Sequence, residues 1–248
     1  MNTVIDNHRH FAECGSTNDL AREWALDPDA PAPCGALVTA DFQTQGRGRR
    51  GRNWLGGSGQ SALMSFVYRP SVPPAEFGQL GLMSALAVAE ALADLTDLDP
   101  RIKWPNDVLI DGGKVAGILI ESCYSPAPRG LPPSRPVVIV GIGVNVGQER
   151  FEDVEGFIYP PTSLRLATGR EWGTASVIRA VAVALPVWEE CWRKNGFAPV
   201  LEGCRARLAV GAAVRRGEEQ GQLWGLEADG GAVVRRADGT FAHWTTVD

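Results

Sequence analysis

Lysine is scarce in this chain of 248 residues, which contains 21 arginines but only three lysines, Lys103, Lys114 and Lys194. The five cysteines are odd in number and widely spaced, without a CxxC pair, which argues against a disulfide framework and against a structural zinc site. No run approaches the roughly 18 uncharged apolar residues of a membrane span, and the polar N-terminus lacks a signal-peptide core. The composition therefore predicts a cytoplasmic protein without a membrane partner.

Positive charge gathers in one stretch, QGRGRRGRNW, from Gln45 to Trp54. The formal net charge is −5, so without these four arginines the remaining chain would carry −9. A nucleic-acid binder usually spreads basic residues over a whole face. A nucleic-acid patch and a solvated loop are alternatives, but a stretch between two predicted strands favours a cradle for a small anion, since glycine lets backbone N–H groups approach it. The spacing fits neither a Walker loop nor a dinucleotide-binding turn.

Hydrophobic periodicity predicts an α+β fold in which a long helix packs across a sheet. The expected strands are 36–43, 61–69, 101–111, 114–122 and 137–146, and the expected helices begin at Ser16 and span 78–95 and 174–195. Thr174 is expected to cap the last helix, and Asp111-Gly112-Gly113 to turn a hairpin. Five prolines within Cys123–Pro136 predict an exposed loop.

From Ala209 onward the pattern changes to short β runs separated by turns such as Asp238-Gly239. The sequence therefore predicts a large domain over residues 1–203 and a small β-barrel-like domain over residues 204–248.

Two of the three lysines flank the segment WPND within a predicted hairpin. In a chain that otherwise uses arginine, Lys103 and Lys114 indicate a task for a compact ammonium group, such as placing one charge beside a phosphoryl group. Asp107 could hold Mg²⁺ or form a salt bridge with Lys103 or an arginine, and the sequence leaves both open. Trp54 could stack on a nucleobase or belong to the core, and Asn145 could close a turn or bind an adenine edge.

Four motifs occur in order: GRGRRGR, KWPND, the lysine of GGKVAGILIE, and GIGVNV. Together they resemble biotin protein ligases, in the short form without an N-terminal DNA-binding domain. The resemblance implies that the biotin carboxylate attacks the α-phosphate of MgATP to give biotinyl-5′-adenylate and pyrophosphate. A lysine of the biotin carboxyl carrier domain of a carboxylase then attacks this mixed anhydride. Such a reaction needs no enzyme nucleophile, in agreement with the lack of an obvious Ser/His or Cys/His arrangement.

The resemblance also implies roles for single residues. Contacts to biotin are implied for Ser16, Thr17, Asn18 and Gln43, with the backbone of Gly46, Arg47 and Gly48 closing over it. Catalytic and phosphate contacts are implied for Arg49, Arg50, Lys103, Asp107 and Lys114, with Asp107 as the Mg²⁺ ligand. Contacts near the adenine are implied for Trp54 and Asn145, and Gly117 completes the binding set.

Family membership would imply a mixed α/β catalytic domain followed by an SH3-like barrel, acting as a monomer or a homodimer without nucleic acid. The segment SGQSALMS after Trp54, and Gln45 within the arginine stretch, depart from the family pattern.

Three alternatives differ in class or substrate. A lipoate or octanoate ligase or transferase would share the fold, but the arginine stretch and KWPND are typical of the biotin enzymes. A non-catalytic biotin sensor would have no need of transition-state cations such as Lys114. A nucleic-acid-binding module is disfavoured by the acidic remainder of the chain.

Overall fold

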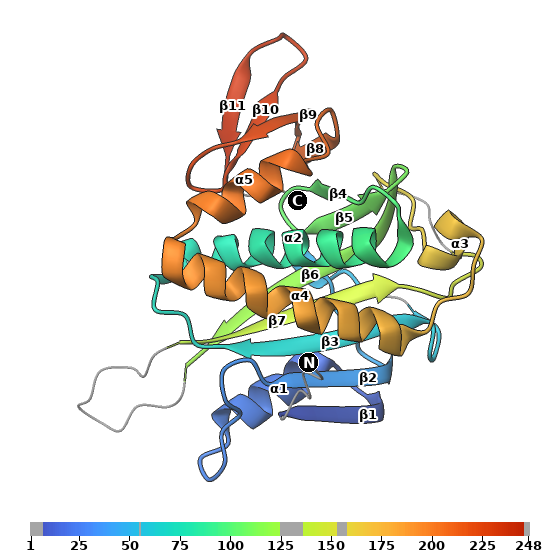
Figure 1. Cartoon of the computed structure of the whole chain (residues 1–248). Helices are drawn as coiled ribbons and strands as arrows, with labels where there is room; N and C mark the ends of the chain where they lie inside the picture. Colours follow the sequence, from blue (N-terminus) through green and yellow to red (C-terminus); the bar gives the residue numbers. More distant parts are fainter. Residues whose placement is uncertain (1–6, 55, 125–135, 153–157, 246–248) are drawn as a thin grey trace.

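The computed structural model describes residues 7–54, 56–124, 136–152 and 158–245. A seven-stranded sheet occupies its centre (Figure 1), with the strands β1 (His8–Cys14), β2 (Leu37–Gln43), β3 (Ser61–Tyr68), β4 (Arg101–Lys103), β5 (Asp107–Ile110), β6 (Gly113–Cys123) and β7 (Val137–Asn145). Their order is β1-β2-β3-β7-β6-β5-β4. β1 runs parallel to β2 and the other neighbours are antiparallel, so the sheet is mixed, as predicted.

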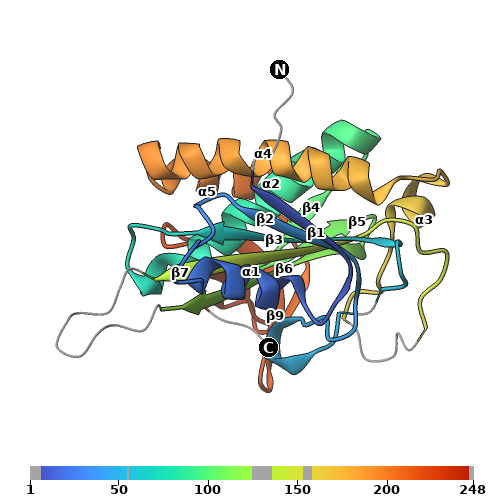
Figure 2. The same cartoon turned by 90° about the horizontal axis from the view of Figure 1, so that it is seen from below.

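Helices cover both faces of this sheet (Figure 2). They are α1 (Thr17–Leu26), α2 (Phe77–Thr96), α3 (Leu164–Thr168), α4 (Thr174–Asn195) and α5 (Ala198–Ala206). Residues of β7 alternate between two apolar clusters: Val138 and Val140 pack with α2 and α4, whereas Val137 and Ile139 pack with α1. A strand covered on both faces reads as a continuous apolar run, which explains the sequence VVIV.

The helix α2 forms the centre of the larger cluster. With the turn before it, Pro74–Thr96 is long and apolar enough to cross a membrane, but most of it is buried inside the protein. It packs against β6, α4 and α5, and the hydroxyls of Ser84 and Thr96 donate to backbone carbonyls one turn earlier. Its apolar character is therefore that of a core helix.

The N-termini of two helices differ in detail from the prediction. α1 begins after Ser16 as expected, but the Ser16 side chain makes no capping hydrogen bond. The N–H of Thr17 instead donates to Oε1 of Gln43 at 2.7 Å, so a distant side chain supplies the cap. α4 is preceded by Gly173 as its N-cap, and Thr174 is the first helical residue, so the predicted Thr174 cap was wrong by one position.

The segment predicted as one strand over 101–111 forms two short strands, β4 and β5. β5 and β6 make the expected hairpin, and Asp111 and Gly112 at its turn have φ of 49° and 77°. Two consecutive left-handed residues match the right-handed twist of a hairpin. The proline-rich loop predicted for Cys123–Pro136 falls mostly outside the described residues.

A second, antiparallel sheet lies at the C-terminal end, with the strands β8 (Ala213–Arg216), β9 (Glu219–Leu226), β10 (Ala232–Arg235) and β11 (Phe241–Trp244). The segment that leads into β8 is joined to β4, because Ile102 exchanges backbone hydrogen bonds of 2.7 and 2.9 Å with Arg207 and Ala209. The indole N–H of Trp104 also donates to the carbonyl of Gly230 at 2.9 Å. The predicted domain boundary after residue 203 falls inside α5, and the division into domains remains a prediction.

Trp104 is 2% exposed, and its replacement by Phe would leave the Gly230 carbonyl without this donor. We expect Trp104→Phe to lower the free energy of unfolding by about 1 to 3 kcal/mol, measured by urea denaturation. Trp224→Phe, at a side chain 49% exposed, is the matched control and should change little. Equal stability of the two variants would contradict the role of Trp104 as a tie between the sheets.

Candidate active site

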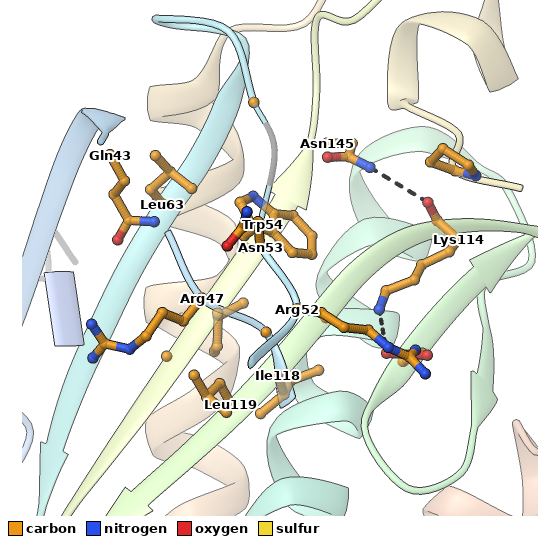
Figure 3. A pocket seen from close by; sticks show the side chains of 18 of the residues that line it. Gln43, Arg47, Arg52, Asn53, Trp54, Leu63, Lys114, Ile118, Leu119 and Asn145 are labelled. Atoms are coloured by element: carbon orange, nitrogen blue, oxygen red, sulfur yellow. Dashed lines mark hydrogen bonds and ion pairs between the residues drawn. The ribbon is translucent and has the colours of Figure 1, made fainter. Parts of the chain in front are cut away.

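A pocket of about 880 Å³ opens on the face of the large sheet that carries α1 (Figure 3). Its floor is formed by β3, β6 and β7, and its walls by the start of α1 and by the loop of residues 44–54, here called the arginine loop. Arg215 of the C-terminal sheet also lines it. The volume is within the roughly 300 to 1,000 Å³ of typical small-molecule sites.

Glycines hollow out the floor of this pocket. Gly117 of β6 and Gly143 of β7 are register partners, and Gly141 lies two residues before Gly143. A Cβ atom on Gly141 would lie 2.3 Å from Oδ1 of Asn18, and one on Gly143 would lie 2.5 Å from the Trp54 ring. Glycine and apolar residues therefore alternate in GIGVNV because the strand has two faces: the glycines face the pocket, and Ile142 faces the core cluster.

Trp54 lies in the pocket and does not belong to either apolar cluster. Its ring covers Gly117 and Gly143, and Nζ of Lys114 lies 5.9 Å from the ring centroid. The indole N–H is buried and has no hydrogen-bond partner among the described residues. Trp54 is therefore a pocket residue rather than a core residue, and its stacking on a nucleobase stays a prediction.

The arginine loop folds back on itself. The N–H of Trp54 donates to the carbonyl of Gly46 at 2.9 Å, and the N–H of Gly48 to that of Arg52 at 2.6 Å. The turn between them requires a left-handed Arg50, whose φ is 57°. Among the described residues, Arg47, Gly48, Arg49 and Arg52 line the pocket, whereas Arg50 and Gly46 do not. Arg52 is thus a pocket residue that the sequence did not single out.

Arg49 is held by the KWPND motif. Its Nη1 donates to Oδ1 of Asn106 at 3.2 Å, and the Asn106 side chain donates to the carbonyl of Ile118 at 2.8 Å. Burial lowers the pKa of Arg49, and the negative charge of Asp107 opposes this shift. Asn106 was missed as a site residue, although a polar residue between Pro105 and Asp107 was a visible signal.

Asp107 lies between the two predicted lysines. Its Oδ1 is 2.7 Å from Nζ of Lys114, outside hydrogen-bond alignment, and its Oδ2 is 3.7 Å from Nζ of Lys103. Lys103 is 8% exposed, and burial lowers its pKa, with Asp107 opposing the shift and Lys114 and Arg49 adding to it. Three cations therefore surround one carboxylate, which leaves this end of the pocket positively charged and suited to an anion.

The opposite end of the pocket carries neutral polar groups. Oε1 of Gln43 accepts from the backbone N–H and the hydroxyl of Thr17, at 2.7 and 2.9 Å. These two bonds fix the orientation of the Gln43 amide, and its NH₂ group has no partner among the described residues. Asn18 also lines the pocket, but its amide donates to Glu121 at 2.7 Å and accepts from Ser65 at 2.6 Å.

Asn145 marks the end of β7 beside Lys114. Its NH₂ donates to the carbonyl of Thr162 at 3.0 Å, and its Oδ1 lies 3.4 Å from the amide nitrogen of Gln148. Gln148 is 4% exposed, donates to Ser61 at 2.7 Å, and its Oε1 has no partner in the described part of the chain. Gln148 was not predicted, although it is a polar residue three positions after Asn145.

The described residues contain no group of three or more His, Cys, Asp or Glu side chains that could hold a metal ion. The carboxylates lining the pocket are Asp107, Glu149 and Glu152. Mg²⁺ is commonly held by one or two carboxylates together with substrate phosphates. Asp107 fits such an ion as one protein ligand, provided that a bound phosphate group supplies others.

Replacement of Lys103 by Met removes a buried cation whose charge is only partly compensated by Asp107. We expect Lys103→Met to raise the free energy of unfolding by on the order of 1 kcal/mol at about pH 7, measured by urea denaturation. Because burial lowers the pKa of Lys103 below its ordinary value of 10.5, the cost to the wild type is full below the lowered pKa. This cost fades as the pH rises toward 10.5.

The advantage of the variant should therefore shrink as the pH rises from neutral toward 10.5. Lys194→Met is the matched control, because Lys194 is 59% exposed and pairs with Glu190 on α4. A Lys103→Met protein less stable than the wild type at neutral pH would contradict the inferred cost.

The chain is similar to known proteins over most of its length. Residues 15–130 match the Biotin/lipoate A/B protein ligase family. The biotin acetyl-CoA-carboxylase ligase of Paracoccus denitrificans is 36% identical over 208 residues, which cover 81% of this chain and 84% of that protein. The bifunctional ligase/repressor BirA of Bacillus subtilis is 33% identical over 230 residues, or 90% of this chain and 68% of that protein.

Among solved structures, the biotin protein ligase from Aquifex aeolicus in complex with biotin and ATP superposes with a TM-score of 0.78. The two are 30% identical, and the match covers 98% of this chain and 97% of the other. The chain therefore belongs to the biotin/lipoate A/B protein ligase family, as one of its biotin protein ligases.

Proposed function

We propose that this protein attaches biotin to a lysine of a biotin carboxyl carrier domain, at the expense of ATP and through biotinyl-5′-adenylate. The observation that carries the proposal is the placement of Lys103, Lys114 and Arg49 around Asp107 at one end of a glycine-floored pocket. The named activity of the Paracoccus relative and the biotin and ATP bound in the Aquifex structure support this assignment.

The first step joins two anions, the biotin carboxylate and the α-phosphate of ATP. Their mutual repulsion opposes the approach, and negative charge grows on the phosphate oxygens in the transition state. The ammonium of Lys114, whose side chain is 27% exposed, offsets both effects, with Arg49 and Arg52 adding positive charge from the arginine loop. The residues act by holding reactants together and stabilising charge, and none becomes covalently attached.

The biotin part and the nucleotide part of the adenylate are assigned to opposite ends of the pocket. The free NH₂ of Gln43 is suited to donate to the carbonyl oxygen of the ureido ring, and the Ser16 hydroxyl lines the same end. Asn145 and Gln148 lie at the opposite end beside Lys114, where the nucleotide would be placed. The Trp54 ring lies between the two ends of the pocket and offers a flat apolar surface for the base.

The second step requires that the mixed anhydride survive until the acceptor lysine arrives. The acceptor amine displaces AMP, which leaves with the electron pair of the broken C–O bond, and a proton leaves the attacking nitrogen. Free adenylate would also react with water and with unrelated amines. The arginine loop, closed over one side of the pocket, limits the access of both.

Mg²⁺ is part of the proposal, with Asp107 as the residue that would hold it beside the phosphates. When bound, the ion would neutralise phosphate charge. A cytoplasmic setting is supported by the five cysteines, all of which are free thiols. Action without nucleic acid, and as a monomer or a homodimer, is proposed on the resemblance stated above.

The test is mass spectrometry of a purified biotin carboxyl carrier domain after incubation with the protein, biotin and MgATP. We expect the mass of the carrier to rise by one biotinyl group. Lys114→Ala should slow this gain by about 10²- to 10³-fold, the usual cost of removing one group that stabilises transition-state charge. Lys194→Ala is the matched control, since that lysine lies on the exposed side of α4, and should retain full activity.

A mass gain with lipoate or octanoate on a lipoyl domain, without any gain from biotin, would assign the chain to the other branch of its family. Tight biotin binding without transfer to any acceptor would instead indicate a sensor. Full activity of Lys114→Ala would contradict the role given to its ammonium group.

A further inference from the structure

Arg47 has a different environment from the other pocket-lining arginines of the loop. Its Nη1 and Nη2 donate to the two carboxylate oxygens of Asp19 at 2.6 and 2.8 Å. Nη2 also lies 3.4 and 3.5 Å from the carboxylate oxygens of Glu121. This bidentate geometry is the strongest form of an arginine–carboxylate pair, and it joins the arginine loop to α1 and β6.

The anionic partners of Arg47 are themselves held in place. Glu121 accepts from the amide of Asn18 at 2.7 Å, and the oxygen of that amide accepts from Ser65 at 2.6 Å. Arg22, one turn along α1, forms an ion pair with the same Asp19 carboxylate. The carboxylates that bind Arg47 are therefore held in place by side chains of α1 and β3.

The charges in this contact favour its formation. The hydrogen bond from Arg47 holds the pKa of Asp19 below its ordinary value, and the bond to Asp19 raises the pKa of Arg47. The side chains of Arg47, Asp19 and Glu121 are each about one third exposed, so solvent weakens the pairing but does not remove it. Figure 3 shows that the two arginine side chains point in different directions: Arg47 points away from Lys114, whereas Arg52 extends toward it.

We propose that Asp19, together with Glu121, forms a latch for Arg47 that keeps the arginine loop closed on the pocket and thereby sets how long the acyl-adenylate stays bound. This inference rests on the proposed function. Asp19 is a positioning residue in this reaction, because it acts through Arg47 and the loop. Glu121 provides a second carboxylate for Arg47, and Asn18 holds Glu121 in place through a hydrogen bond.

A purely structural role for Asp19 makes different predictions. Asp19 lies in the first turn of α1, where a negative charge interacts favourably with the helix dipole. In that case Asp19→Asn would lower the melting temperature and leave the residence time of the adenylate unchanged. The experiment therefore measures release and stability on the same samples.

The protein is loaded with radiolabelled biotin and MgATP, and the release of labelled adenylate is followed by rapid filtration after a chase with unlabelled biotin. We expect Asp19→Asn to release adenylate about 5- to 50-fold faster, the effect of losing charge-assisted hydrogen bonds at a partly exposed site. Labelling of lysines on an added bystander protein should increase in parallel. Glu23→Gln, on the exposed side of α1, is the matched control and should match the wild type.

Coupling to the loop is tested by a double-mutant cycle with Arg47→Gln. If Asp19 acts through Arg47, the double variant should release adenylate no faster than Arg47→Gln alone. Asp19→Glu, which keeps the charge, should recover part of the slow release.

Unchanged release from a folded Asp19→Asn protein, or additive effects in the cycle, would overturn the latch. If the wild type releases no pyrophosphate from ATP with biotin, the proposed function fails instead. The latch is then decided by limited trypsin digestion without ligands, because an opened loop exposes its arginines and Asp19→Asn should be cut several-fold faster than Glu23→Gln. Equal cleavage rates would reject it.

Discussion

The crowding of three cations around one carboxylate is the constraint on which the site depends. Lys103, Lys114 and Arg49 all interact with Asp107 in the described part of the chain, so their positive charges exceed what Asp107 can compensate. Such an arrangement opposes folding, because a buried cation without a full partner loses hydration. It persists because β4, β5 and β6 are fixed by the apolar cluster around α2, which supplies stability from elsewhere.

Residues without direct chemistry make this crowding possible. Asn106 accepts a hydrogen bond from Arg49 and donates one to the carbonyl of Ile118, and Trp104 joins the segment between β4 and β5 to the C-terminal sheet. The KWPND motif thus combines two charged groups with two groups that fix their positions. An anionic substrate would supply the missing negative charge, so the site is most favourable electrostatically when it is filled, and binding and catalysis use the same imbalance.

Much of this was predictable, and the limits have physical causes. Most strands and the helices α2 and α4 followed from apolar periodicity, but the largely exposed β1 carries no such pattern and was not predicted. The scarcity of lysine indicated Lys103 and Lys114, which the structure brings together around Asp107. The choice between Arg50 and Arg52 was not predictable, because one left-handed residue in the loop decides which side chains face the pocket. Gln148 and Asn106 depend on partners distant in sequence, whereas the N-cap of α4 failed by a single residue, as helix ends often do.

The arginines of the arginine loop have different environments although they belong to one short run of like charges. Nothing in GRGRRGR itself distinguishes its arginines, since their side chains are chemically identical and their spacing is nearly regular. The surrounding protein distinguishes them by where it places counter-charge: Asp19 and Glu121 form ion pairs with Arg47, while Arg49 donates to a neutral amide and shares the charge of Asp107 with two lysines. An arginine whose charge is matched by protein carboxylates anchors the loop, and one whose charge is unmatched is left to interact with substrate. The environments of Arg47 and Arg49 therefore depend on acidic residues of other elements, which is why a motif in one loop is not sufficient to assign their roles.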